Sequence, residues 1–403
     1  MRFSTVAAGV LTSAVLAVPL ASPALAGTAT PSADPRVSAA GTTARHDHHR
    51  AQVHSNPALQ KALDDLVKAG APGAMAEVRS AEGTWTGSSG RGDLLRTEPP
   101  RPDGLFRAGS VTKTFVATAV LQLVDEGKIS LEDSVERHLP GLVPTGEKIT
   151  VRQLLNHRSG LFDYTESLWP GGLREIYEKR FAQYTPLDLI REANRHKPNF
   201  EPGTKGGYSN TNYVLLGLLI EKVTGKPVEK QIDERILKPI KLHQTSFPGK
   251  ATNIPGPHAH AYLRLDGADS PFVDMTKSNM SWAWAAGALT SSTHDLNTFN
   301  KALIGGKLIS DDMLKEMKEA EPLGAGAPYG LGITRLDDPD FGTAYGHTGG
   351  TPGYTTYAYT LADNSRQVTL SINTMADGEA ENRAFQMALK SLLAEDTAKG
   401  DAK

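Results

Sequence analysis

The chain has 403 residues, of which 43 are lysine or arginine and 45 are aspartate or glutamate, so its formal net charge is -2. This small charge gives no electrostatic reason to expect nucleic acid or an anionic membrane surface as a partner. The length suffices for one large domain or two lobes with a proper core. The chain contains no cysteine, so no disulfide stabilises that core.

The chain begins with segments that are predicted to precede the folded domain. Arg2 is followed by the apolar run VAAGVLTSAVLAVPLA, and the tripeptide ALA at 24–26 fits the small-x-small rule for cleavage. Residues 1–26 are therefore predicted to be a signal peptide, and the mature protein is expected to be secreted without a membrane anchor. Residues 27–54 are rich in Ala, Thr, Pro and Ser, which predicts a disordered leader.

The folded domain is predicted to extend from residue 55 to residue 403 and to begin with a helix. Leucines recur at helical spacing between residues 59 and 66, and Gly70 ends the run. The stretches GAMAEVRS (73–80) and GTWTGSSG (83–90) then predict two short strands.

A long helix is predicted over residues 110–126, ended by Gly127. It is apolar almost all round, which indicates that it is buried inside the domain. Residues 128–284 show mostly helical periodicity and predict a helical lobe.

The last part of the domain is predicted to be a group of strands followed by a final helix. YGLGITRL, AYGHTGG, TTYAYTLA and RQVTLSINT alternate and are separated by turn residues, and ENRAFQMALKSLLAE is amphipathic. The fold class is therefore α+β. We expect the early and late strands to share one antiparallel sheet flanked by helices, with a cleft between this sheet and the helical lobe.

Ser110 and Lys113 stand at the start of the buried helix, in the stretch RAGSVTKTF. Residues i and i+3 lie on the same helix face, so the amine can reach the hydroxyl. Serine is a poor nucleophile until a base removes its proton, and a lysine whose pKa is lowered by burial can be that base. The alternative is an N-cap serine beside a snorkelling lysine.

Two further stretches carry polar groups suited to the same chemistry. In the stretch GGYSN, Tyr208 and Asn210 point the same way if the backbone is extended. A phenol can relay a proton, and the Asn amide can hold a substrate carbonyl or the lysine. The alternative is a core tyrosine and an asparagine that caps the next helix.

The stretch YGHTGG places two glycines in a predicted strand, which is typical of close approach by another backbone. A peptide substrate could lie antiparallel along this edge. The backbone N–H groups of Gly350 and Ser110 could then form an oxyanion hole. The alternative is a bulge or a turn.

The order S-x-x-K, Y-x-N, H-T-G resembles that of the penicillin-recognising serine hydrolases, above all the secreted serine D-alanyl-D-alanine carboxypeptidases and transpeptidases related to class C beta-lactamases. The resemblance covers roughly residues 55–395. It implies that Ser110 is the nucleophile, Lys113 its base and Tyr208 the proton carrier to the leaving group. It also implies a set of substrate-binding residues, namely Asn210, Trp282, His347, Thr348, Gly349 and Gly350, with Trp169 as a further aromatic wall.

Two departures from that pattern affect recognition of a substrate carboxylate. Relatives carry an arginine just after YGLG, whereas this chain has Thr334 there and Arg335 one step later. One step along a strand turns a side chain to the opposite face, so we expect Arg335 to point away from the cleft. Gly350 stands where relatives often have a hydroxyl residue.

The resemblance implies an exported D-Ala-D-Ala carboxypeptidase or transpeptidase that acts on peptidoglycan stem peptides and is acylated by beta-lactams, without a cofactor or metal and as a monomer. An esterase, a D-amino-acid amidase and a beta-lactamase with the same nucleophile remain alternatives. A non-catalytic binding protein and a zinc hydrolase using His258 and His260 are alternatives from other classes. If a cationic His347 helps to bind an anionic substrate, activity is expected to fall above the pKa of His347.

Overall fold

The computed structural model describes residues 55–324 and 326–394. The predicted signal peptide (1–26) and leader (27–54) lie outside the described residues. Within the described ranges, no helix is both long enough and apolar enough to cross a membrane.

A six-stranded antiparallel sheet forms the centre of the fold, with the strand order β2-β1-β10-β9-β8-β7. Its strands are β1 Gly73–Ser80, β2 Gly83–Gly90, β7 Thr334–Asp338, β8 Gly342–Thr351, β9 Tyr354–Leu361 and β10 Gln367–Ile372. Because β1 pairs with β10, the predicted sharing of one sheet by the early and late strands is confirmed. Both bounds of β1 and β2 agree with the stretches predicted from their alternation.

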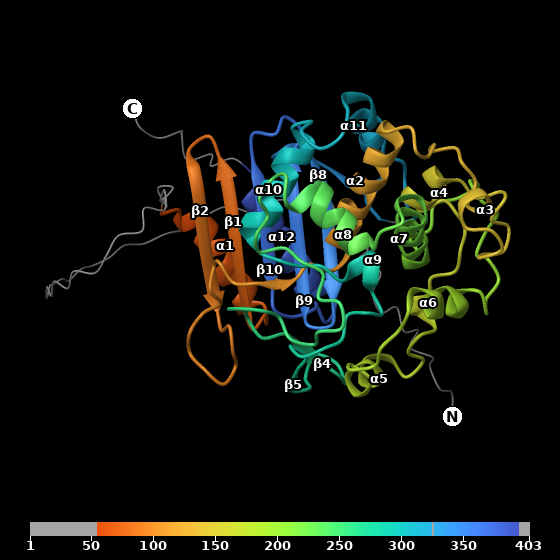
Figure 1. Cartoon of the computed structure of the whole chain (residues 1–403). Helices are drawn as coiled ribbons and strands as arrows, with labels where there is room; N and C mark the ends of the chain where they lie inside the picture. Colours follow the sequence, from red (N-terminus) through yellow and green to blue (C-terminus); the bar gives the residue numbers. More distant parts are fainter. Residues whose placement is uncertain (1–54, 325, 395–403) are drawn as a thin grey trace, which may run out of the picture.

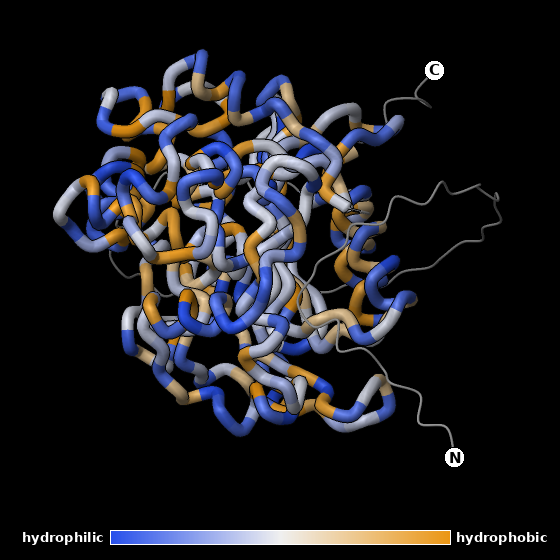
Figure 2. The backbone as a smooth tube through the Cα atoms, turned by 90° about the vertical axis from the view of Figure 1, so that its right-hand side faces the viewer, coloured by the Kyte–Doolittle hydropathy of each residue, from blue (hydrophilic) through white to orange (hydrophobic). Residues whose placement is uncertain are grey.

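Helices cover both faces of this sheet. The first and last helices, α1 Pro57–Lys68 and α12 Glu379–Leu393, contact each other and pack on one face. On the other face, α10 Thr293–Ile304 contacts β1, β9 and β10. Figure 2 shows hydrophobic and hydrophilic stretches alternating along the backbone, as expected for elements with one buried side.

Between β2 and α10 the regular elements are mainly helices joined by long loops, and α3–α6 lie at the opposite end of the molecule from β1 and β2 (Figure 1). Its α-helices after the nucleophile helix are α3 Val135–His138, α4 Val151–Leu155, α5 Gly172–Glu178, α6 Pro186–Ala193, α7 Asn210–Thr224, α8 Val228–Ile232 and α9 Trp284–Gly287, with single turns η2 Tyr164–Glu166 and η3 Asp233–Leu237. Two short strand pairs complete it, β3 Phe106–Arg107 with β6 Thr290–Ser291 and β4 Tyr262–Arg264 with β5 Phe272–Asp274. A short helix, α11 Asp311–Lys318, follows α10.

The helix predicted from Ser110 is α2 Thr112–Asp125, and it is preceded by one 3-10 turn, η1 Gly109–Val111, that contains Ser110. It contacts α7, α8 and α9 on one side and β8 on the other, which explains its apolar surface all round. The turn replaces the first α-helical turn because Gly109 is left-handed, with φ 56°, and Thr112 Oγ1 donates to its carbonyl at 2.7 Å.

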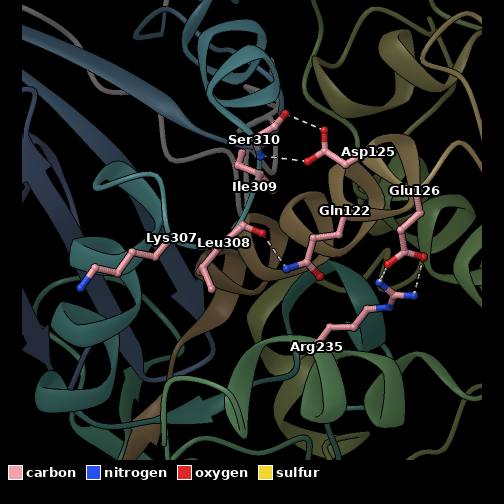
Figure 3. A pocket seen from close by; sticks show the side chains of 8 residues that line it. All are labelled: Gln122, Asp125, Glu126, Arg235, Lys307, Leu308, Ile309 and Ser310. Atoms are coloured by element: carbon pink, nitrogen blue, oxygen red, sulfur yellow. Dashed lines mark hydrogen bonds and ion pairs between the residues drawn. The ribbon is translucent and has the colours of Figure 1, made fainter.

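The far end of α2 is fixed by polar contacts around an open hollow of about 460 Å³ (Figure 3). Gln122 donates to the Leu308 carbonyl at 2.8 Å, and Asp125 accepts from the backbone and the hydroxyl of Ser310 at 2.9 and 2.6 Å. Arg235 donates to Glu126 at 2.6 and 3.2 Å. These contacts hold the end of α2 opposite to Ser110.

A stacked pair of phenylalanines couples α2 to the helix that covers the sheet, and it generates a stability prediction. The rings of Phe115 and Phe299 are fully buried, 3.7 Å apart at their centroids and inclined by 12°. Replacing Phe299 by alanine is expected to lower the free energy of unfolding by about 3–5 kcal/mol, measured by denaturant unfolding. The matched variant Phe181→Ala removes a ring that is 49% exposed and should cost much less. Equal losses in the two variants would contradict this packing role.

Candidate active site

Ser110 lies where the loop after β3 meets α2 and β8. Its side chain is partly exposed, whereas Val111 and Lys113 beside it are buried. The preceding backbone is held because Ala108 N donates to the Leu289 carbonyl at 2.8 Å. The hydroxyl of Ser110 is therefore accessible from outside while its surroundings are fixed.

Lys113 is fully buried, and its amine contacts three oxygens. Its Nζ lies 3.0 Å from Ser110 Oγ, 2.7 Å from Asn210 Oδ1 and 2.6 Å from the Ala286 carbonyl. The last two can only accept, so they take two N–H bonds of the amine. When the amine is neutral, its lone pair is left for the Ser110 hydroxyl.

The environment of Lys113 favours this neutral form. Burial lowers the pKa of Lys113 to about 7, although the Asp163 charge acts in the opposite direction. A large fraction of the amine is then uncharged at neutral pH, as a base that removes the Ser110 proton requires. The predicted Ser110–Lys113 contact is present, and its catalytic role stays a prediction.

Tyr208 reaches the same hydroxyl from the segment before α7. A side-chain hydrogen bond joins it to Ser110, and the Lys113 amine lies 4.9 Å from the centre of its ring. Burial raises the pKa of Tyr208 far above its ordinary value, against the effect of the Ser110 hydrogen bond. The phenol therefore keeps its proton at neutral pH and can donate it.

Asn210, the first residue of α7, connects Lys113 to a buried carboxyl group. Its Oδ1 accepts from Lys113, and its Nδ2 donates to Asp163 Oδ2 at 2.9 Å. Thr165 donates to the other Asp163 oxygen through its backbone N–H at 3.0 Å and its hydroxyl at 2.9 Å. Burial raises the pKa of Asp163 while these bonds oppose the shift. Of the two roles predicted for Asn210, the structure shows the contact with the lysine.

The glycines of β8 let that strand approach the nucleophile. A Cβ added to Gly349 would lie 1.9 Å from the Ala108 carbonyl oxygen and 3.3 Å from Ser110 N, and one added to Gly109 would lie 2.7 Å from Gly350 N. Real Cβ atoms are not tolerated at such distances, so the close backbone approach requires glycine. The two N–H groups predicted to form an oxyanion hole belong to these adjoining segments, and their role stays a prediction.

His347 is buried, and its two nitrogens have protein partners. Its Nδ1 donates to the Thr348 carbonyl at 2.6 Å, so its Nε2 accepts from the Tyr329 hydroxyl at 2.9 Å. Burial, together with the nearby Lys113, lowers the pKa of His347 to about 3. The imidazole is therefore neutral near pH 7, and the condition of a cationic His347 is not met there.

The other side chains predicted to bind substrate are those of Thr348, Trp282 and Trp169. The Thr348 hydroxyl lies 3.0 Å from the Tyr359 hydroxyl, on the sheet face opposite to His347. Trp282 and Trp169 are largely buried, with an edge-to-face contact at 5.0 Å. The Trp282 carbonyl accepts from the Tyr164 hydroxyl at 2.6 Å. The two tryptophans thus contact each other, and their role as walls of a substrate cleft stays a prediction.

Arg335 lies on the sheet face opposite to Thr334, as expected from its place one step further along the strand. Arg335 pairs in register with Tyr345, which shares a face with His347 two residues on, whereas the Thr334 side chain bonds to Tyr359 on the other face. Its guanidinium binds Asp337 at 3.0 Å and lines a hollow beside α11, away from Ser110 and Lys113.

Sequence reasoning missed three buried residues of this site. Asp163 accepts from Asn210, Tyr329 donates to His347, and the His157 ring contacts that of Tyr208. Only weak signals for them are present in the sequence. His157 and Asp163 are polar residues next to apolar ones, in the stretches LLNH and GLFDY, and Tyr329 directly precedes GLG. Each lies at least 18 positions from its partner, so spacing could not reveal the contact.

The histidines proposed for a zinc site have other contacts. The rings of His258 and His260 are 6.1 Å apart, and His260 binds Asp274 at 2.8 Å. Within residues 55–324 and 326–394, no group of three or more His, Cys, Asp or Glu side chains could hold a metal ion.

Solved structures with the same fold include a D-stereospecific amidohydrolase and a D-amino acid amidase. A D-stereospecific amidohydrolase from Streptomyces sp. is 37% identical, covers 83% of this chain and 98% of its own, and has a TM-score of 0.76. The D-amino acid amidase from Ochrobactrum anthropi SV3, complexed with L-phenylalanine, is 28% identical over 83% of this chain and 97% of its own, with a TM-score of 0.74.

Sequence relatives include penicillin-binding proteins. One from Bacillus subtilis (strain 168) is 29% identical over 315 residues, which are 75% of this chain and 68% of the relative. The PbpX protein of the same organism is 28% identical over 282 residues, and the chain spans 66% of its length. The Beta-lactamase family matches residues 59–391. The chain therefore belongs to the Beta-lactamase family, whose members are serine acyl-transferases and hydrolases.

Proposed function

We propose that this protein hydrolyses the amide bond that follows a D-configured residue, through an acyl-enzyme on Ser110. The observation that carries the proposal is the buried Lys113 amine, with a pKa of about 7, at 3.0 Å from Ser110 Oγ. The D-stereospecific amidohydrolase and D-amino acid amidase among the similar structures support the configuration of the substrate.

The reaction follows from the contacts of Ser110. Its Oγ bonds to the substrate carbonyl carbon while its proton passes to Lys113. The C–N bond then breaks, and the leaving nitrogen takes the proton of the Tyr208 phenol, which the Lys113 ammonium restores. Water attacks the ester in the same way, with its proton passing to Lys113, and releases the acid and the free Ser110 hydroxyl.

The identity of the leaving group depends on what binds a terminal carboxylate. The predicted cation, His347, is neutral, and Lys113 already donates to fixed oxygens. Arg335 is occupied by Asp337. The neutral His347 and the existing contacts of Lys113 and Arg335 favour ammonia or an uncharged amine as the leaving group over a free amino acid, and so favour a D-amino-acid amidase or D-peptidase.

An exported D-Ala-D-Ala carboxypeptidase is the second candidate. Similarity to penicillin-binding proteins of Bacillus subtilis supports it, and so does the predicted signal peptide, because peptidoglycan lies outside the membrane. Peptidoglycan stem peptides and beta-lactams would then be its ligands.

The acyl-enzyme is tested by peptide mapping. Incubation with the p-nitrophenyl ester of an N-acyl-D-alanine, followed by acid quenching, should leave the acyl group on the peptide that contains Ser110. Ser110→Ala should lose at least about 10³-fold in turnover of a D-alanine amide, as expected when a nucleophile is removed. Ser310→Ala, at the opposite end of α2, serves as the matched control and should keep full activity. Undiminished turnover by Ser110→Ala would refute the proposal.

The contacts of Arg335 lead to an experiment that distinguishes a D-amino-acid amidase from a D-Ala-D-Ala carboxypeptidase. Arg335→Ala should change kcat/KM for a diacyl D-Ala-D-Ala peptide by less than about fivefold, because an exposed ion pair contributes little. D-alanine amide should be hydrolysed faster than that peptide. A much larger loss on the peptide, with amide hydrolysis unchanged, would identify Arg335 as a carboxylate ligand and favour the carboxypeptidase.

The pKa of Lys113 predicts the pH profile. The neutral amine is the base, so kcat/KM should rise with pH through about 7 and fall tenfold per pH unit well below it. No decline should follow from His347, whose pKa of about 3 leaves it neutral throughout this range. The profile is measured with an uncharged amide substrate. If kcat/KM instead stayed constant from about pH 8 down to about pH 5, a range around the ordinary pKa of histidine, Lys113 would not be the base.

A further inference from the structure

His157 follows α4 in an unusual backbone conformation. It is completely buried, and its φ is 59°, in the left-handed region. This conformation costs free energy for a residue with a side chain, although histidine adopts it more often than most. The strain indicates that the surrounding contacts require this residue in this orientation.

The polar atoms of His157 bind the segment that carries Tyr208. Its carbonyl accepts from Gly207 N at 2.9 Å, and its Nδ1 accepts from Ser209 N at 3.2 Å. Asn212 also donates to Nδ1, at 3.1 Å. Two N–H groups directed at Nδ1 require that it carry no proton, so the ring is neutral and its hydrogen is on Nε2.

The ring of His157 lies against the catalytic phenol. Its centroid is 4.2 Å from that of Tyr208, and Tyr329 meets it edge-on at 4.8 Å. The Nε2 atom is buried without a hydrogen-bond partner in the described structure. An unpaired buried N–H is unfavourable, so an apolar ring would pack here at lower cost if packing were the only requirement.

We propose that His157 is a positioning residue that holds the Tyr208 phenol at Ser110 Oγ for proton transfer to the leaving group. It fixes the backbone on both sides of Tyr208 through Gly207 and Ser209, and its ring face sets the plane of the phenol. The inference rests on the proposed acyl transfer at Ser110 but not on the identity of the substrate.

The test compares leaving groups that do and do not need a proton. His157→Phe keeps a ring but lacks the acceptor, so it should lower kcat/KM for a D-alanine anilide at least about tenfold, within the usual contribution of a general acid. Labelling of Ser110 by a fluorophosphonate, from which fluoride leaves unprotonated, should change less than about threefold under the same principle. His138→Phe is the matched control, since it removes a histidine that binds Asp133 outside the site, and should change neither rate.

A double-mutant cycle separates positioning from general damage. If His157 acts through Tyr208, then His157→Phe should add no further loss to Tyr208→Phe on the anilide. His157→Asn tolerates the left-handed backbone and keeps an acceptor at the place of Nδ1, so it should recover part of the loss and remains usable if the Phe variant does not fold. Equal losses with both probes, or additive losses in the cycle, would overturn the proposal.

A substrate-free measurement tests the positioning of Tyr208 separately from the proposed reaction. The crystal structure of His157→Phe, or of His157→Asn, should show the Tyr208 hydroxyl beyond hydrogen-bonding distance of Ser110 Oγ, with the larger displacement in the Phe variant. An unmoved phenol in both would contradict the positioning role. If the proposed function is wrong but the positioning role is right, the variants should still show this displacement, and the wild type should not hydrolyse the anilide.

Discussion

The burial of one lysine amine among oxygen acceptors is the constraint on which the site depends. A charged ammonium in that place loses its hydration, which lowers the pKa of Lys113 to about 7, yet two fixed carbonyl oxygens still hold its N–H bonds. The same geometry therefore disfavours the charged ammonium of Lys113 and orients the lone pair of its neutral amine. Without that burial the amine would stay protonated, and Ser110 would be an ordinary serine at the start of a helix.

The rest of the fold explains how so polar a group can be buried. Apolar residues cover α2 on every side. Contacts with α10 and with the α10–α11 loop fix the position of α2 between the sheet and the helical part. Glycines in β8 allow the strand to approach the loop of Ser110, where any side chain at Gly349 would collide with Ala108. Asp163 and Asn210 complete the enclosure, so that the amine contacts protein oxygens instead of water.

The fold and the polar triplets were predictable from sequence because both rest on local patterns. The alternation of apolar and polar residues predicted β1 and β2, and the i, i+3 spacing predicted the Ser110–Lys113 contact. Both patterns involve residues that are close together along the chain. The charge of His347 was not predictable, because it depends on burial beside Tyr329. Asp163 and His157 bind partners 47 and 52 positions away, which no local pattern encodes.

Direct titration of the Lys113 amine tests the central claim. Nitrogen-15 NMR of protein labelled at lysine, with Lys113→Met used to assign the signal, should show this amine titrating near pH 7, apart from the other lysines. The same titration in Ser110→Ala should keep that low pKa, because burial and not the hydroxyl causes it. A Lys113 pKa at its ordinary value of about 10.4 would contradict the account, since the amine would then be charged and unable to accept the serine proton.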